Sequence, residues 1–227
     1  GRFCNVIALG LAPAAKHISG CRTVVTGTPV RESFLSPQPL PVWVPSGTGP
    51  LIVEVGGSQG ALGLNMMVRE VLPFLLKEGC RVVHITGKNY TYIKEMRHSN
   101  YIAKSFTNEI ASLLQHADLA ISRAGASALS ELAVCGTPAI LVPYPLAKDQ
   151  HQDFNAAVAA ELGAAVIVHQ HEPTHNTLRE TLSRLLKSRL SSHKDNFDPL
   201  STMKLGMNQL AARGAEKVLA DILEEFS

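Results

Sequence analysis

Short apolar runs alternate with longer segments of helical periodicity along most of this chain. The apolar runs predict strands at 4–9, 22–26, 51–55, 81–86, 101–104, 117–122, 138–142 and 164–168. The periodic segments predict helices at 59–77, 90–97, 108–116, 126–135, 152–162, 174–188 and 203–225. From residue 51 onward this is a βαβ series, which requires right-handed crossovers. The pattern predicts an α/β fold, a parallel sheet with helices on both faces.

The predicted helix 59–77 is apolar along one face, at Leu64, Met67, Val68, Val71 and Leu75. This period buries one stripe against a sheet, so we interpret the methionine as a core residue. Pro73 has no backbone N–H and its ring crowds the preceding turn. We therefore expect Pro73 to kink this helix or to end it early.

Two stretches are predicted to lie outside the main sheet. Segment 36–50 contains Pro37, Pro39, Pro41, Pro45 and Pro50. So many fixed φ angles and missing donors exclude the interior of a sheet, which predicts an ordered linker or long loop and a domain boundary near Arg31. The polar stretch 188–199 would allow the last helix to pack away from the main sheet.

Composition narrows the class of protein. The chain has 227 residues, 45% hydrophobic and 18% charged, which is enough for one globular domain or one and a half. A net charge of +2 and 5% aromatic residues do not favour nucleic acid as a partner. The four cysteines show no C-x-x-C spacing and are interpreted as reduced packing residues. No apolar run approaches the roughly 18 residues of a membrane span, and we interpret the run 6–11 as a strand rather than a signal peptide.

Two turns of small residues follow apolar runs and open onto predicted helices. They are Glu54-Val55-Gly56-Gly57-Ser58-Gln59-Gly60-Ala61 and Ser122-Arg123-Ala124-Gly125-Ala126-Ser127-Ala128-Leu129-Ser130-Glu131. In a parallel sheet both turns emerge at one edge, where free backbone N–H groups and helix N-termini can surround an anion. Such a crevice suits a diphosphate, although a glycine turn alone can also serve tight strand–helix packing.

The details disfavour two other phosphate-binding motifs. A dinucleotide fingerprint would need glycine in place of Val55, and the strand 81–86 is not followed by the acid that binds a ribose. The sequence also has no G-x-x-x-x-G-K-[ST] motif. NAD and P-loop nucleotide sites are therefore not expected.

Three sets of polar residues have two interpretations each. Glu131 lies close enough to the crevice to accept hydrogen bonds from a ribose diol, or it is a helix acid stabilised by solvent and the dipole. Arg123 contacts a phosphate or forms a structural ion pair. The histidines His169, His171 and His175 fall in a polar loop with no evident fourth ligand, which disfavours a zinc site.

Further motifs carry a resemblance to a known family. They are Thr26-Gly27-Thr28-Pro29-Val30-Arg31, Gly56-Gly57-Ser58-Gln59-Gly60-Ala61, Ser122 to Ala126 leading to Ser130-Glu131-Leu132, and Pro143 with Lys148-Asp149, His151-Gln152 and Asn155-Ala156. In this order they resemble the MurG family of bacterial GlcNAc transferases. The resemblance implies a GT-B glycosyltransferase, whose two Rossmann-like domains face a cleft and whose C-terminal domain binds the nucleotide sugar.

The resemblance also implies roles for individual residues. Ser58 and neighbouring N–H groups would hold the diphosphate, Glu131 the ribose, and Gln152 with His151 the GlcNAc hydroxyls. The uracil would lie near the backbone of Thr107. The full expected set of substrate-binding residues is Arg31, Ser58, Gln59, Gly60, Phe106, Thr107, Arg123, Ala126, Ser127, Ala128, Leu129, Ser130, Glu131, His151 and Gln152.

The activity implied by the resemblance is transfer of GlcNAc from UDP-GlcNAc to undecaprenyl-pyrophosphoryl-MurNAc-pentapeptide (lipid I), which forms lipid II in peptidoglycan synthesis. This step of cell wall biogenesis serves cell shape and cell division. The family works at the cytoplasmic face of the bacterial inner membrane as a peripheral protein. The transfer is inverting, and since no D-x-D motif occurs in the sequence, we expect no metal and no cofactor.

In the family, the acceptor site, the presumed catalytic base and the membrane-associating surface belong to an N-terminal domain. Residues 1–30 resemble only its tail, and the sequence begins without Met, so we expect a fragment. Residues 31–202 are the expected donor-binding domain, and 203–227 the expected helix that packs back on the N-terminal domain. We expect the fragment to be soluble, to bind UDP-GlcNAc weakly and to transfer nothing by itself.

Three alternatives remain open. The chain could be a stand-alone subunit that binds a nucleotide sugar and recruits a separate acceptor half. It could be an enzyme like UDP-GlcNAc 2-epimerase, although no matching acid and base pair is evident. It could also be a noncatalytic nucleotide-binding or interaction domain.

Overall fold

A computed structural model of the chain describes residues 4–57, 60–88, 96–170, 174–190 and 197–226. The strands are β1 (Val6–Leu9), β2 (Arg22–Val25), β3 (Leu51–Val55), β4 (Arg81–Ile85), β5 (Tyr101–Lys104), β6 (Leu119–Ser122), β7 (Ala139–Leu141) and β8 (Ala165–Ile167). The helices are α1 (Glu32–Leu35), α2 (Leu62–Lys77), α3 (Ile110–His116), α4 (Ala126–Cys135), α5 (His151–Glu161), α6 (Thr174–Leu190), α7 (Pro199–Leu210) and α8 (Ala215–Glu224). Two 3₁₀ turns, η1 (Ala12–His17) and η2 (Lys148–Gln150), complete the elements.

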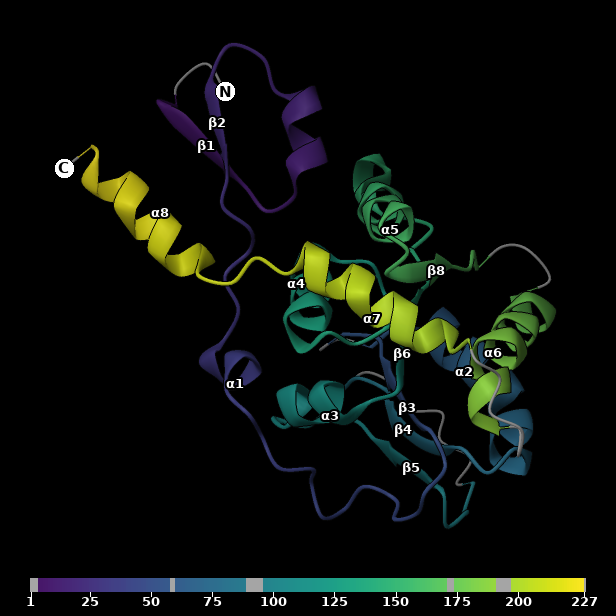
Figure 1. Cartoon of the computed structure of the whole chain (residues 1–227). Coiled ribbons are helices and arrows are strands. Elements are labelled where there is room, and N and C mark those ends of the chain that lie inside the picture. The colour runs from purple at the N-terminus through teal and green to yellow at the C-terminus, as the bar shows by residue number, and fades with distance from the viewer. Residues whose placement is uncertain (1–3, 58–59, 89–95, 171–173, 191–196, 227) are drawn as a thin grey trace.

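Two parallel sheets organise the molecule (Figure 1). The larger sheet has the strand order β5-β4-β3-β6-β7-β8, and every pairing in it is parallel. The smaller sheet consists of β1 and β2, also parallel. Each strand predicted from the sequence is present, with its ends shifted by no more than two residues. The predicted α/β parallel fold is confirmed.

The larger sheet is covered on both faces, as a parallel sheet requires. Alternation along β3 shows the two faces, because Leu51 and Val53 point to one apolar cluster and Ile52 to the other. The first cluster contains residues of α1, α3, α4 and α5, and the second contains residues of α2 and α6. Helix α7 contributes Met207 to the first cluster and Met203 to the second, so it packs where the two layers meet.

Helix α2 buries the predicted stripe, from Leu64 to Leu75. The expectation that Pro73 ends this helix early is wrong, because the helix continues to Lys77. Pro73 lies on the exposed side. There water can bond the carbonyl that its missing N–H leaves free, so the proline is tolerated.

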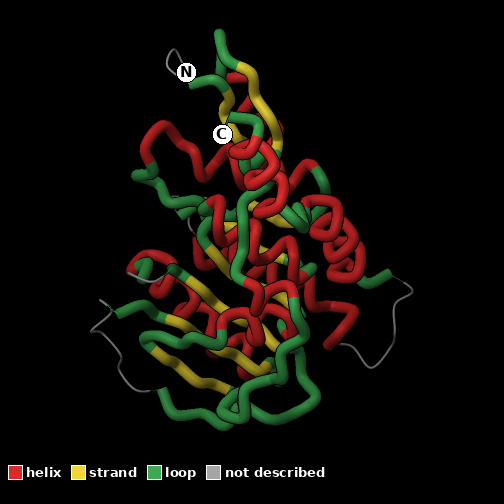
Figure 2. The backbone as a smooth tube through the Cα atoms, turned by 90° about the vertical axis from the view of Figure 1, so that its left-hand side faces the viewer, coloured by secondary structure: helices red, strands yellow, loops and turns green. Residues whose placement is uncertain are grey.

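The last predicted helix, 203–225, is instead two helices, α7 and α8. Helix α7 begins earlier than predicted, with Pro199 at its first position and the Asp198 carboxylate accepting a hydrogen bond from the Leu200 N–H at 3.2 Å. The chain breaks before α8 at Gly214, whose φ of 84° is left-handed. Helix α8 lies beside the smaller sheet (Figure 2), where the Glu225 carboxylate accepts a hydrogen bond from Arg22 at 2.8 Å.

The proline-rich segment 36–50 contains no helix or strand, as predicted for an ordered linker or long loop. It follows the short helix α1 and is tied to the domain at several points. Gln115 accepts a hydrogen bond from the Gln38 N–H at 2.8 Å, and Arg81 donates to the Gly49 carbonyl at 2.8 Å. The predicted helix 90–97 lies mostly outside the described residues. Within the described residues, no helix is long and apolar enough to cross a membrane.

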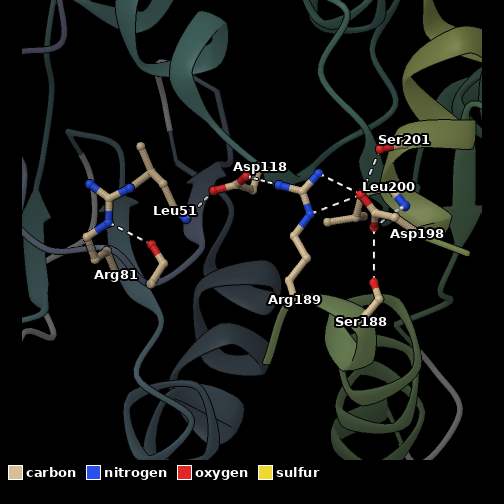
Figure 3. A network of polar contacts seen from close by, with 9 residues as sticks. Leu51, Arg81, Asp118, Ser188, Arg189, Asp198, Leu200 and Ser201 are labelled. Atoms are coloured by element: carbon tan, nitrogen blue, oxygen red, sulfur yellow. Dashed lines mark hydrogen bonds and ion pairs between the residues drawn. The ribbon is translucent and has the colours of Figure 1, made fainter. Parts of the chain in front are cut away.

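A network of charged side chains lies at the amino ends of the strands of the larger sheet (Figure 3). The Asp118 carboxylate accepts a hydrogen bond from the Leu51 N–H at 2.7 Å and pairs with Arg189 of α6. Arg189 also pairs with Asp198 at 2.8 Å. Although partial burial opposes it, hydrogen bonds from Arg189, Ser201 and Ser188 lower the pKa of Asp198 to about 2. The network joins β3, β6, α6 and α7.

Candidate functional site

A cavity of about 550 Å³ opens at the carboxyl ends of the central strands. Its walls come from the turn after β3, the segment after β5, the start of α4, and single residues before α1 and in α5. The lining residues are Arg31, Val55, Gly56, Gly57, Ile85, Ser105, Phe106, Thr107, Ile110, Ser122, Arg123, Gly125, Ser127, Ala128, Glu131 and Gln152. The parallel topology therefore brings both small-residue turns to one crevice, the place where open α/β sheets bind ligands.

The glycine turn after β3 approaches neighbouring backbone closely. Gly57 and Gly60 have φ angles of 91° and 83°. A Cβ on Gly60 would lie 2.4 Å from the Thr86 carbonyl oxygen, so no larger residue fits there. Gly60 does not line the cavity. The predicted contacts Ser58 and Gln59 lie outside the described residues.

The second turn leads directly into α4. Gly125 precedes the helix in an extended conformation, and no side chain caps the first turn. The amide groups of Ala126, Ser127 and Ala128 therefore lie at the positive end of the helix dipole beside the cavity. Three predicted contacts of this turn, Ala126, Leu129 and Ser130, do not line the cavity. Leu129 is buried in the core, and Ser130 donates its hydroxyl hydrogen bond to the Ala126 carbonyl at 2.9 Å.

Glu131 and Arg31 face each other across the rim. The Arg31 Nη2 atom lies 3.7 Å from Glu131 Oε1, and the two side chains are 61% and 26% exposed. Burial raises the pKa of Glu131, and the charge of Arg31 opposes that rise. A pair this long and this exposed contributes little to stability. Both groups are thus available for a ligand.

Arg123 lines the cavity, but its guanidinium is engaged by the protein. Its Nη1 donates to the carbonyls of Val142 and Pro143 at 3.0 and 3.1 Å, and its Nη2 donates to Gln170 Oε1 at 2.7 Å. Burial lowers its pKa, while the neighbouring Glu54 favours its charge. These contacts favour the structural interpretation of Arg123 over a direct contact with phosphate.

Glu54 is a buried acid whose role was not predicted from the sequence. Its two carboxyl oxygens have no hydrogen-bond partner among the described residues, and burial raises its pKa well above the ordinary range, against the charge of Arg123. The His84 Nε2 atom lies 3.2 Å from both Glu54 Oε2 and Asn65 Oδ1, and burial with the charge of Arg69 lowers the pKa of His84 to about 4. A pKa of about 4 leaves His84 neutral at pH 7, and burial disfavours the ionised form of Glu54. A single acid inside the apolar run 51–55 was the available signal.

His151 and Gln152, which lie next to each other at the start of α5, line different cavities. Gln152 lines the cavity, and its Oε1 accepts a hydrogen bond from the Tyr144 N–H at 2.9 Å. His151 instead lines a second cavity of about 590 Å³ between α5 and η1. Its Nδ1 lies 2.7 Å from the Lys148 carbonyl oxygen.

The segment after β5 forms the remaining wall. Phe106 is exposed, with the Lys88 Nζ atom 4.7 Å from its ring centroid. Thr107 is buried and contacts Glu109 through its hydroxyl. Among the described residues, no group of three or more His, Cys, Asp or Glu side chains is arranged to hold a metal ion.

The fold and the cavity at its strand ends define a Rossmann-like α/β domain. Residues 51–210 match the glycosyltransferase family 28 C-terminal domain. The chain therefore belongs to glycosyltransferase family 28.

The curated relatives agree with this assignment. A protein of Synechococcus sp. (strain CC9605), named UDP-N-acetylglucosamine--N-acetylmuramyl-(pentapeptide) pyrophosphoryl-undecaprenol N-acetylglucosamine transferase, is 59% identical over 224 residues, or 99% of this chain and 63% of that protein. A protein of the same name from strain CC9902 is 60% identical over 226 residues, or 100% of this chain and 63% of that protein. The resemblance to the MurG family is confirmed.

A solved structure agrees in fold. The crystal structure of Acinetobacter baumannii MurG superposes with a TM-score of 0.72 at 24% identity, over 99% of this chain and 61% of that one. The chain spans about 63% of the length of the curated relatives that it matches.

Proposed function

We propose that this chain is the donor-binding part of a transferase that moves GlcNAc from UDP-GlcNAc to undecaprenyl-pyrophosphoryl-MurNAc-pentapeptide, the step that forms lipid II in peptidoglycan synthesis. The observation that carries the proposal is the single cavity that joins the two small-residue turns with Arg31, Thr107, Glu131 and Gln152. The names of the curated relatives supply the substrate.

In this proposal each wall of the cavity binds a different part of UDP-GlcNAc. The diphosphate lies between the glycine turn and the uncapped start of α4, where N–H groups and the helix dipole favour negative charge. The Glu131 carboxylate accepts hydrogen bonds from the ribose hydroxyls. The uracil lies against Thr107, and Gln152 reaches the GlcNAc hydroxyls. Arg31 lies on the rim, near the ribose and the diphosphate.

In the transfer, the site residues would stabilise the departing UDP. A hydroxyl of the acceptor attacks the anomeric carbon with inversion, and the bond to the β-phosphate oxygen breaks. Negative charge grows on the departing UDP, and fixed N–H donors lower the energy of that charge. Burial disfavours the ionised form of Glu54, and an ionised carboxylate this close to the glycine turn would repel the diphosphate. We propose a metal-independent reaction, since the sequence has no D-x-D motif.

We further propose the division of the chain into three parts. Residues 1–30 would be the tail of an N-terminal acceptor domain, 31–202 the donor domain, and 203–227 the segment that returns toward the N-terminal domain. Within that last segment α7 packs against α4 and α6, whereas α8 reaches β2 through Glu225. Acceptor binding, the catalytic base and peripheral association with the cytoplasmic face of the inner membrane would belong to the N-terminal domain.

Calorimetric titration of the chain with UDP, UDP-GlcNAc, ADP and NAD tests the proposal. We expect UDP and UDP-GlcNAc to bind and ADP and NAD to bind far more weakly. Preference for NAD would contradict the assignment, and the absence of binding to all four would favour the noncatalytic alternative.

Activity assays test the proposed division of labour and the epimerase alternative. We expect the isolated chain to transfer no GlcNAc to a lipid-linked acceptor, and robust transfer would contradict the proposed division of labour. Conversion of UDP-GlcNAc to its 2-epimer by the chain would instead support the epimerase alternative.

A further inference from the structure

Trp43 holds the linker 36–50 against the domain beside the cavity. Trp43 is the single tryptophan of the sequence. Its indole N–H donates to Glu109 Oε2 at 2.6 Å, a short hydrogen bond to a charged acceptor. The Lys104 Nζ atom lies 3.8 Å from the ring centroid, at the end of β5. The indole is therefore fixed both at its edge and over its face.

Glu109 connects Trp43 to the wall of the cavity, because it also contacts Thr107. Its backbone N–H donates to the Thr107 hydroxyl at 3.1 Å, and the same hydroxyl donates to Glu109 Oε2 at 3.4 Å. Glu109 also immediately precedes α3, where a negative charge is favoured by the helix dipole. One carboxylate thus joins the linker, the start of α3 and the segment that lines the cavity.

We propose that Glu109, held by the indole of Trp43, is a positioning residue for segment 105–107, and that the two together set the affinity for the nucleotide base. This inference rests on the proposed function, which assigns the base to that segment. Segment 105–107 lies between β5 and α3 without regular structure, and all three of its residues line the cavity. A backbone contact with a ligand needs a wall held within about 0.5 Å, which side chains behind it must provide.

The other end of the linker offers a matched control. Arg81 donates from Nε to the Gly49 carbonyl at 2.8 Å and from Nη1 to the Pro45 carbonyl at 3.3 Å. Arg81 is the first residue of β4, at the strand end opposite the cavity. Its replacement loosens the same linker without touching segment 105–107.

The test is calorimetric titration of the full chain with UDP and, separately, with inorganic pyrophosphate. We expect Trp43→Phe and Glu109→Ala each to weaken UDP binding about three- to tenfold, the effect of losing roughly one hydrogen bond. Pyrophosphate affinity should not change, because it lacks the base. Glu109→Gln keeps an oxygen that can accept the indole N–H, so it should lose less UDP affinity than Glu109→Ala. Arg81→Met should leave both affinities unchanged.

A second measurement uses Trp43 itself as the reporter. Saturation with UDP should change its fluorescence emission, and pyrophosphate should not. Unchanged UDP affinity in both Trp43→Phe and Glu109→Ala would overturn this inference alone, as would an equal loss of pyrophosphate affinity. Absence of UDP binding to the unaltered chain would overturn the proposed function together with it.

Discussion

Charged side chains are closely paired at the amino ends of the parallel strands and only weakly paired at the carboxyl ends. At the amino ends, Arg189 is shared by Asp118 and Asp198, and those carboxylates also accept hydrogen bonds from backbone and hydroxyl groups (Figure 3). At the carboxyl ends, Arg31 and Glu131 are 3.7 Å apart, and the start of α4 has no side-chain cap.

This difference separates stability from binding. Paired charges at the amino ends join elements that are distant in the sequence, and they leave little capacity for a ligand. The carboxyl ends retain donors and acceptors whose partners are weak, so a ligand can satisfy them at small cost to the fold. Substitutions at the two ends should therefore have different consequences.

The largest effect is expected for Gly60→Ala at the carboxyl ends. The new Cβ would be 2.4 Å from the Thr86 carbonyl oxygen, at a φ of 83°. Strain and overpacking together should lower the free energy of unfolding by about 3 kcal/mol, measured by urea denaturation. The matched control is Gly57→Ala, which has a φ of 91° but, among the described residues, no atom beyond its chain neighbours within 4 Å of the new Cβ, and should cost about 1 kcal/mol. Equal losses would mean that the close approach to Thr86 is unimportant.

Glu131→Ala should separate binding from stability. If the carboxylate holds the ribose through charged hydrogen bonds, the binding free energy of UDP-GlcNAc should fall by about 1 to 3 kcal/mol in calorimetry. The free energy of unfolding should change by no more than about 0.5 kcal/mol. Glu216→Ala, an exposed acid of α8, serves as the control and should change neither. Unaltered affinity in the folded Glu131 variant would remove its proposed role.

Arg189→Met should show the reverse behaviour. The methionine keeps an apolar stem but leaves Asp118 and Asp198 without their cation. We expect the free energy of unfolding at pH 7 to fall by about 1 to 2 kcal/mol. UDP affinity of the folded variant should stay the same, and a loss of affinity would show that the two strand ends are not independent.

The smallest effect concerns pH. Hydrogen bonds lower the pKa of Asp198 from 3.8 to about 2, so the unfolded state takes up its proton first as the pH falls. The stability supplied by Asp198 is thus complete above about pH 4 and is lost as the pH falls toward 2. Urea denaturation should show a steeper loss across this range for the unaltered chain than for Asp198→Asn. Parallel pH profiles would exclude this contribution.

Local sequence patterns predicted most of the fold. Strands such as 51–55 and helices such as α4 were found because a buried element repeats its apolar residues with the period of its own backbone. The errors came from single residues whose effect depends on surroundings. Pro73 does not stop α2 because it faces solvent, and the break at Gly214 lies inside a stretch that still reads as helical.

The site was predictable in position more than in detail. The two small-residue turns indicated one crevice, and the structure brings Arg31, Thr107, Glu131 and Gln152 to it. The engagement of Arg123 by Gln170 joins residues that are 47 positions apart, and that of Trp43 by Glu109 joins residues 66 apart. Such contacts depend on tertiary packing, which no local period encodes.

One close approach ties the two ends of the chain together. The segment leaving β2 passes the segment entering α8 at Gly27, where a Cβ would lie 2.1 Å from the Cβ of Ala212 and 3.5 Å from that of Ala215. Two separate connections between the small sheet and the larger one thus cross at a single point. Because this contact leaves no room for a Cβ, any residue larger than glycine at position 27 would push the two connections apart.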